Sequence, residues 1–380
     1  MRGVLVLAVL ASACGARTDL GGVSHGNGNG DAASPSSPFV QVACGMHHTC
    51  ARRQDGAVFC WGLDTSAQTS APANATSPPT QVPLGPASTI GVGAYHSCAI
   101  VASHIFCWGD DLVGQLGSSV PSSAKPLAVA VADATGVTAG YSYTCALLAS
   151  GGVACWGQGA EGELGDGASK SSTTPIQTNV ENVTALSRSA GGSEHTCTVG
   201  ANGSVECWGL NADGEIGAGA DETYSPLPEL AIVSGAVSVA VADYSTCAVM
   251  HDRTLRCWGD NAYGQLGDGT VASSGVPVTA KVGGVRAVAV GQSHTCALQD
   301  GGRVSCWGEN FDGELGDGTT TSSTSPVVAM DGGAIDICAG GNHTCVATED
   351  GRVLCWGLGT SGELGAVADR RTTPTPVDGL

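Results

Sequence analysis

The chain has 380 residues and a formal net charge of −19 at pH 7, and it contains 58 glycines and 17 cysteines. The negative charge argues against a nucleic-acid partner, because binding to phosphates requires clustered lysine and arginine. A hydrophobic content of 42% argues against wholesale disorder, and abundant glycine predicts many tight turns in an all-β or repetitive protein.

The first segment, residues 1–13, is expected to be a signal peptide. Arg2 precedes an apolar run that ends at Ala13 and is too short to span a bilayer. The small residues before Cys14 resemble a bacterial lipoprotein signal, although Ala11 stands where such signals prefer leucine. This resemblance implies a lipidated Cys14 at the outer membrane or cell surface. An ordinary secretory signal, with a periplasmic or secreted protein, is the alternative.

Residues 15–38 consist largely of Gly, Ser, Asn and Pro, with almost no side chain to bury. Such a composition is typical of a flexible tether. Together with Cys14, these residues are predicted to form a linker, 14–38, whose lipid would be the protein's contact with the membrane.

Residues 39–380 contain a sevenfold repeat. The triplet Cys-Trp-Gly occurs seven times and includes all seven tryptophans, which follow one another at intervals of 47 to 52 residues. Each copy shows short alternating apolar runs and glycine-rich turns, with no helical period, and therefore predicts strands. Units of about fifty residues with several strands each predict the blades of a β-propeller, and seven units suffice to close the ring.

A second cysteine precedes the cysteine of each triplet, by ten residues in six copies and by nine in one. A loop centred on Gly301 sets Cys296 opposite Cys306, and a loop one residue shorter sets Cys98 opposite Cys107. Disulfides are favoured over metal binding, because no CxxC pair occurs and an exported protein meets oxidising conditions. The predicted blade disulfides are Cys50–Cys60, Cys98–Cys107, Cys145–Cys155, Cys197–Cys207, Cys247–Cys257, Cys296–Cys306 and Cys345–Cys355.

Cys44 and Cys338 remain, in the corresponding strands of the first and last units. They lie one residue out of phase, and successive strand residues point to opposite faces, so one can face forward and the other back. A Cys44–Cys338 disulfide that closes the ring is therefore predicted, with two unpaired buried cysteines as the alternative. The final residues, TTPTPVDGL, are expected to supply a strand that the first unit lacks.

The motif G-x-x-H-T-C-A-L, followed by D-G-x-V-x-C-W-G-x-N-x-x-G-Q-L-G-D-G, resembles the repeat of the regulator of chromosome condensation. Members of that family form seven-bladed propellers, and the resemblance covers residues 39–380. It implies the fold. It does not imply the function, because the nuclear founder of the family acts on a small GTPase and chromatin, and neither suits an exported chain with a net charge of −19. The cysteine pair departs from the founder and fits an oxidising compartment.

Five units carry a histidine two residues before the first cysteine, and Tyr143 and Ser245 replace it in the others without evident compensation. A ring of imidazoles could bind a metal, but hydrogen bonds from the rings to neighbouring backbone are favoured, and no metal site is predicted. The five histidines are His48, His96, His195, His294 and His343. The out-of-phase His47, His104 and His251 are expected at the surface.

Most triplets are followed by Gly-Glu/Gln-Leu/Ile-Gly, a motif that the first unit, reading LDTSAQTSAPAN, has lost. The acids of these loops could suggest calcium, but no D-x-D-x-D-G run supplies converging oxygens. Tight turns with the acids in solvent are therefore expected. No catalytic motif stands out, and no cofactor is predicted.

These features predict an exported, monomeric, disulfide-braced propeller that acts as a binding or scaffold module for a protein or glycan partner. Departures from the repeat, at residues 63–80 and 219–230, mark the predicted contact loops. The alternative is a polysaccharide hydrolase or lyase, which would need carboxylates that converge on one propeller face with raised pKa values.

Overall fold

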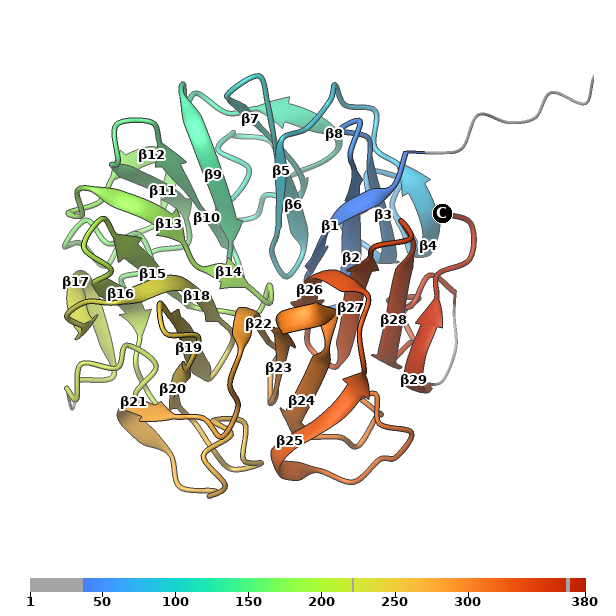
Figure 1. Ribbon diagram of the computed structural model, residues 1–380. Helices are drawn as coiled ribbons and strands as arrows, with labels where there is room; N and C mark the ends of the chain where they lie inside the picture. The colour runs from blue at the N-terminus through green and yellow to red at the C-terminus, as the bar shows by residue number, and fades with distance from the viewer. Residues whose placement is uncertain (1–36, 221, 367–369) are drawn as a thin grey trace, which may run out of the picture. The chain divides into compact units, whose positions relative to one another are not determined.

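The computed structural model describes residues 37–220, 222–366 and 370–380. The predicted signal peptide, Cys14 and most of the linker lie outside the described residues. Seven sheets follow one another along the described chain and are arranged radially around a central axis (Figure 1). The fold is the all-β, seven-bladed propeller that the repeat predicts.

Each blade contains an inner strand, two middle strands and an outer strand, in chain order. The inner strands are β1 (Phe39–Cys44), β5 (Thr89–Val92), β9 (Ala134–Ala139), β13 (Val183–Leu186), β18 (Ala236–Val241), β22 (Val285–Val290) and β26 (Ala334–Ala339). The second strands are β2 (His48–Arg53), β6 (His96–Val101), β10 (Tyr143–Leu148), β15 (His195–Gly200), β19 (Ser245–Met250), β23 (His294–Gln299) and β27 (His343–Thr348).

The third strands, which carry the Cys-Trp-Gly triplets, are β3 (Val58–Asp64), β7 (His104–Asp110), β11 (Val153–Gly157), β16 (Val205–Leu210), β20 (Leu255–Gly259), β24 (Val304–Gly308) and β28 (Val353–Leu358). The outer strands are β4 (Asn74–Gln81), β8 (Ser122–Ala128), β12 (Ser172–Gln177), β17 (Tyr224–Ile232), β21 (Ser274–Thr279), β25 (Ser323–Met330) and β29 (Arg370–Pro376).

The hydrophobic core lies between the blades. All seven tryptophan side chains are fully buried. Trp307 of blade six, for example, packs with Leu266 and Leu255 of blade five and with Val288 of its own inner strand. Because each sheet has two faces and each face meets another blade, apolar residues are buried on both faces of the inner strands.

The strand register sets the two cysteines of each blade opposite each other. Cys296 lies across from Cys306, and the turn between them, η1 (Asp300–Gly302), holds Gly301 at a φ of 74°. In blade two the loop is one residue shorter, yet Cys98 still lies across from Cys107. The structure joins all seven predicted blade pairs, with Cα–Cα distances of 4.1 or 4.2 Å.

Blade seven meets blade one without exchanging a strand. β29 pairs with β28 in the seventh sheet, and β1 to β4 make up the first sheet. The expectation that the C-terminal residues complete the first blade is therefore wrong. In every blade the outer strand follows its own Cys-Trp-Gly strand along the chain, so the last blade is completed by the last strand.

A disulfide between Cys44 and Cys338 spans this seam, with the two Cα atoms 5.5 Å apart. Cys44 lies opposite Thr49 on β2, whereas Cys338 lies opposite Cys345 on β27. This offset of one residue turns the two side chains to opposite sheet faces, so they meet between the blades. Contacts of β1 with β26 and β27 complete the closure.

The fifth sheet contains an additional strand, β14 (Arg188–Ser189), which comes from the chain of blade four and pairs in parallel with β18. Blade four's inner strand β13 ends at Leu186, and Ser187 hydrogen-bonds the backbone of Cys197 before the chain crosses to blade five. This crossover brings Arg188 to the central channel.

Candidate functional site

Each pair of neighbouring blades is joined through one buried backbone carbonyl. It belongs to the second residue of the Gly-Glu/Gln-Leu/Ile-Gly turn. The carbonyl oxygen of Glu215 accepts hydrogen bonds from Trp258 Nε1 (2.7 Å) and from Thr246 Oγ1 (2.9 Å), both in the next blade. The seven acceptors of the tryptophan bonds are Gln68, Gln115, Glu163, Glu215, Gln265, Glu314 and Glu363.

The first blade keeps this turn although its sequence lacks the glycines. The Gln68 carbonyl accepts from Trp108 Nε1 and from Ser97 Oγ, each at 3.0 Å. Ala67 and Ser70, with φ values of 62° and 65°, take the left-handed positions that glycine holds in the other blades. The first unit has lost the glycines of the motif but keeps the turn, because the bonding group is a backbone carbonyl.

The repeated histidines bind the hydroxyl groups of the same network. Each Nε2 lies 2.7 to 2.9 Å from a serine or threonine hydroxyl of the next blade. The Thr246 hydroxyl donates its hydrogen to the Glu215 carbonyl, so it must accept a hydrogen from His195 Nε2. The partner is therefore a side chain across the blade interface, where the sequence predicted backbone.

Burial holds these histidines in the neutral form. It lowers the pKa of four of them to about 3 and that of His343 to about 4. Cys44, His343 and Cys345 place potential ligand atoms within 4.8 Å of one another, but both sulfurs belong to disulfides. The histidine positions are thus part of the hydrogen bonding between blades. His104 and His251 are exposed, and His47 is partly buried.

The two units without this histidine are compensated. A Cβ on Gly93 would lie 2.4 Å from Cε1 of His96, and a Cβ on Gly45, Gly291 or Gly340 would lie similarly close to the rings of His48, His294 and His343, which explains the glycine three residues before these histidines. In blade five the smaller Ser245 leaves space for a Cβ at this point, and Ala242 takes the place of the glycine. In blade three the Tyr143 hydroxyl donates to the His195 carbonyl at 2.6 Å. The sequence itself shows this compensation, because blade five replaces both the glycine, with Ala242, and the histidine, with Ser245.

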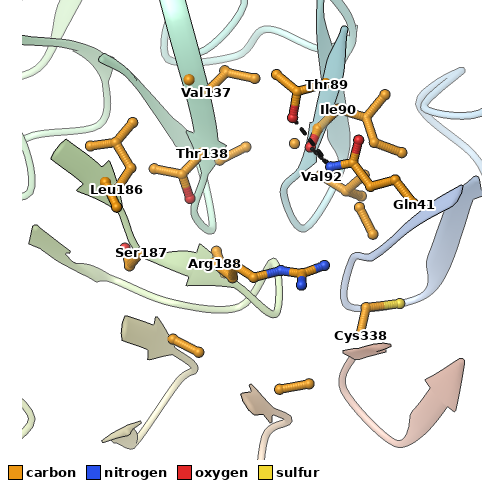
Figure 2. Close-up of a pocket in the computed structure, with 18 of the residues that line it drawn as sticks. Gln41, Thr89, Ile90, Val92, Val137, Thr138, Leu186, Ser187, Arg188 and Cys338 are labelled. Atoms are coloured by element: carbon orange, nitrogen blue, oxygen red, sulfur yellow. Dashed lines mark hydrogen bonds between the residues drawn. The ribbon is translucent and has the colours of Figure 1, made fainter. Parts of the chain in front are cut away.

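The central channel contains a pocket of about 320 Å³, lined by the inner strands (Figure 2). Arg188 extends across it and binds both carboxylate oxygens of Asp336 in blade seven, at 2.7 and 3.1 Å. The guanidinium also donates to the Val42 carbonyl at 3.2 Å, and Asp336 accepts from the Val42 amide at 2.9 Å. The Asp336 carboxylate raises the pKa of Arg188. The sequence does not predict this pair, because neither residue belongs to a repeated motif.

The Arg188–Asp336 pair is expected to stabilise the ring moderately. Because 38% of the Arg188 side chain is exposed within the channel, Asp336→Asn should lower the free energy of unfolding by about 1–2 kcal/mol. The double variant Arg188→Met/Asp336→Asn, which leaves no unpaired charge, should recover part of that loss. Urea unfolding of the wild type, Arg188→Met, Asp336→Asn and the double variant measures the coupling, and additive losses would contradict it.

The turns after the inner strands and the loops after the third strands lie at the same end of every blade. Antiparallel order requires this, and hydrogen bonds join the two segments, as from the Asp260 amide to the Tyr244 carbonyl (2.8 Å). We call this end of the ring the loop face. It comprises the turns 45–47, 93–95, 140–142, 190–194, 242–244, 291–293 and 340–342, and the loops 65–73, 111–121, 158–171, 211–220, 222–223, 260–273, 309–322 and 359–366.

The loop face is strongly acidic over blades three to six, where its exposed or half-buried acids are Glu161, Asp166, Glu194, Asp213, Glu222, Asp243, Asp260, Asp268, Glu309, Asp312 and Asp317. In the described turns and loops of these four blades, Lys170 is the only lysine or arginine. At the opposite end, ion pairs join arginine to aspartate between or within the hairpin turns: Arg253–Asp300, Arg303–Asp331 and Arg352–Asp350. The negative charge is thus concentrated on one end of the ring.

Some acids of the turns are buried, which corrects the expectation that they project into solvent. Glu163, Glu215, Glu314 and Glu363 are almost completely inaccessible. Burial raises the pKa of Glu215 and of Glu314 to about 7. Asn342 Nδ2 donates to Glu314 Oε1 at 3.2 Å, whereas Glu215 Oε1 has no hydrogen-bond partner in the described chain.

Glu215→Gln is expected to stabilise the protein at alkaline pH by about 2–3 kcal/mol. A raised native pKa means that the folded state retains this proton while the unfolded state loses it, so wild-type stability falls as the pH rises from about 4.5 through 7. Glutamine, which occurs naturally at this position in three blades, does not ionise and therefore does not cause this loss of stability. Urea unfolding should show the gain at pH 8 and little difference near pH 4.5, and a gain independent of pH would contradict the assignment.

Two less buried acids meet near the channel on the loop face. Burial and the nearby Glu161, Glu163 and Asp243 carboxylates raise the pKa of Glu194 to about 7. Burial raises that of Asp243 to about 6, while Gln292 Nε2 donates to its Oδ2 at 2.9 Å. This pair satisfies part of the requirement stated for an enzyme, namely interacting carboxylates with raised pKa values.

The predicted contact segments lie partly in outer strands. Residues 74–80 belong to β4, and residues 224–230 belong to β17. Tyr224, Leu227 and Leu230 on β17 are 41 to 50% exposed. Pro226 and Pro228 lie between them, and proline on an edge strand opposes the addition of a further strand.

A shallow groove of about 490 Å³ on the loop face was not predicted. It lies between the loops of blades five and six and is lined by Tyr263, Val271 and Phe311 with threonines of the blade-six loop and β25. The rings of Tyr263 and Phe311 meet edge to face, 5.7 Å between centroids, and Phe311 is 56% exposed. Arg370 donates to the Phe311 carbonyl at 3.2 Å, at the blade-seven side.

Comparison with known families matches the chain to the regulator of chromosome condensation (RCC1) repeat. One form of the repeat matches residues 39–68, 236–265, 285–314 and 334–363, and a second form matches 256–298 and 301–347. These segments are RCC1 repeats, and the protein is a seven-bladed β-propeller of the RCC1 type. No helix among the described residues is long and apolar enough to cross a membrane.

Solved structures share this fold at low sequence identity. Prp20p from Saccharomyces cerevisiae is 20% identical, with a TM-score of 0.76, over 91% of this chain and 87% of its own. Human WBSCR16 is 20% identical, with a TM-score of 0.74, over 83% and 87%. The CRINKLY WD40 ectodomain of the receptor kinase ACR4 from Arabidopsis thaliana is 18% identical, with a TM-score of 0.54, over 88% and 98%.

Proposed function

We propose that this propeller is a binding module that holds a macromolecular partner on its loop face. The observation that supports this most directly is how the repeated polar residues are used. Histidine, threonine, tryptophan and the turn carbonyl bond to one another between blades and are buried. What differs between blades and reaches solvent are the acids and aromatic rings of the loop face, which are the groups that can distinguish partners.

RCC1-type propellers are a common protein-binding scaffold, and the structure of Prp20p was described with its binding to Gsp1p and histones. At 20% identity this relative supports the fold alone. The partner of the present protein is proposed from its own surface to be a protein, with a glycan as the outcome that the experiment must exclude.

The binding test compares two blocks of charge changes. Asp213→Asn/Glu222→Gln/Asp312→Asn neutralises loop-face acids that accept no hydrogen bond through their side chains in the described residues, and we expect it to reduce capture of a partner from surface extracts. A matched block of the same charge change, Glu181→Gln/Glu349→Gln/Asp378→Asn at the opposite end, should capture as the wild type does. Equal capture by both blocks would place the partner elsewhere.

A second candidate function is hydrolysis or cleavage of a polysaccharide, favoured by the interacting Glu194 and Asp243. A protonated carboxyl with a pKa near 7 beside an ionised one is the arrangement that general acid catalysis needs. Turnover on a panel of glycans that is abolished in Glu194→Gln, together with no enriched partner, would favour the enzyme.

We also propose that the protein is exported and anchored by lipid at Cys14. The support is the sequence of residues 1–14 and the pairing of the other sixteen cysteines, since disulfides persist in oxidising compartments. Mass spectrometry of the N-terminal peptide tests it. A diacylated Cys14 is expected, and an unmodified N-terminus after residue 13 would indicate an ordinary secretory signal.

A further inference from the structure

We infer that the partner is a basic protein segment with an apolar anchor, bound across blades four to six of the loop face. This inference rests on the proposed binding function and specifies the chemistry of the partner. Three independent features support it: the charge of the surface, an unpartnered carboxylate beneath it, and an apolar groove at its edge.

The charge of this surface is continuous and uncompensated. Asp213 and Asp260 interact across the interface of blades four and five, and Glu309 and Asp312 interact within blade six. None of these four acids forms an ion pair with a lysine or arginine of the described chain. Like charges held together on a rigid ring repel one another, so a cationic segment that lies over them removes this repulsion and is attracted from a distance.

Beneath these acids lies Glu215, whose Oε1 is buried and has no hydrogen-bond partner in the described chain. The equivalent oxygen of Glu314 accepts from Asn342, and that of Glu363 lies 3.6 Å from Nδ1 of His47, each the residue before the repeated histidine of the next blade. The equivalent residue for Glu215 is Tyr244, which precedes Ser245, and no hydrogen bond joins Tyr244 to Glu215 Oε1 in the described chain. The buried Oε1 atom of Glu215 is therefore an acceptor that no donor of the described chain meets.

The groove formed by Tyr263, Val271 and Phe311 supplies the apolar contact. Phe311 and Val271 are 56% and 60% exposed, and Asp312 and Asp260 lie within three residues of the aromatic pair along the chain. An aromatic or leucine side chain between lysines or arginines would fill the groove while its neighbours meet the acids. Aromatic rings also attract arginine and lysine directly. A neutral glycan could pack on the aromatic rings but would not be attracted by the carboxylates. A basic peptide with an apolar side chain would make both interactions.

The experiment uses the full-length oxidised protein and a library of short fluorescent peptides, graded from acidic to basic, with and without one tryptophan. Basic peptides that contain tryptophan should bind most tightly, and their affinity should fall with added salt. The loop-face block Asp213→Asn/Glu222→Gln/Asp312→Asn should weaken binding about tenfold, and Phe311→Ala about thirtyfold. The opposite-end block Glu181→Gln/Glu349→Gln/Asp378→Asn should leave it unchanged.

Acidic or neutral peptides that bind as well as basic ones, or no binding by any peptide, would overturn this inference. The same holds if the two blocks have equal effects. Each of these results leaves the proposed binding function intact if the wild type still captures a partner that the loop-face block does not. If the wild type and the loop-face block capture the same partner equally well, the proposed function itself is overturned.

Discussion

Replacing Cys44 and Cys338 with alanine is expected to lower the free energy of unfolding by about 5 kcal/mol, which is the largest effect of any single cross-link in this protein. The disulfide closes a loop of 294 residues, whereas each blade disulfide spans 9 or 10. A longer loop restricts the unfolded chain more, so its removal costs more. Alanine is the natural control residue, because it occupies the equivalent positions 339 and 43.

The matched variant is Cys145→Ala/Cys155→Ala, which removes one blade disulfide and should cost about 3 kcal/mol. Both variants are measured by guanidinium unfolding without reductant. If the seam variant is no less stable than the blade variant, the seam disulfide does not restrain the ring. Peptide mapping without reduction provides a direct check, and finding Cys44 and Cys338 as free thiols would contradict the assignment.

Trp258→Ala is expected to lower the free energy of unfolding by about 4 kcal/mol. The indole is fully buried between blades four and five, packs against Gly217, and donates to the Glu215 carbonyl. Alanine leaves a cavity that the disulfide-braced sheets cannot close. Because the same contact recurs at every interface, the loss should be similar for the other six tryptophans.

Trp258→Phe separates packing from hydrogen bonding. Phenylalanine fills much of the cavity but has no donor, and the Glu215 carbonyl keeps the bond from Thr246. A loss of about 1–2 kcal/mol is therefore expected. Equal losses for alanine and phenylalanine would show that the hydrogen bond, and not the volume of the indole, holds the blades together.

The fold was predictable because its information is local and repeated. The interval between tryptophans sets the number of blades, and the distance between paired cysteines sets the hairpin register, even where the loop between Cys98 and Cys107 lost a residue. The one-residue offset between Cys44 and Cys338 also predicted which faces meet at the seam. These inferences use only the alternation of side chains along a strand, which a single sequence displays directly.

The predictions that the structure corrects concern backbone carbonyls and the order of strands, which the sequence does not show. The bonds between blades use the carbonyl of Gln68, and a backbone carbonyl is the same whatever residue carries it. The first unit lacks the leading segment that TTPTPVDGL resembles, which predicts a strand shared with the first blade. Only the order of strands within each sheet shows that this segment is the outer strand of the seventh blade.

The sequence alone determined seven blades, their cysteine pairs and an acidic, all-β chain. The tertiary structure decided that Glu215 is buried, that Arg188 reaches Asp336 across the channel, and that the acids and the Tyr263–Phe311 groove share one end of the ring. The physical reason is that burial, charge and grooves depend on distances between residues of different blades. Those distances are set when the ring closes, and no interval along the chain encodes them.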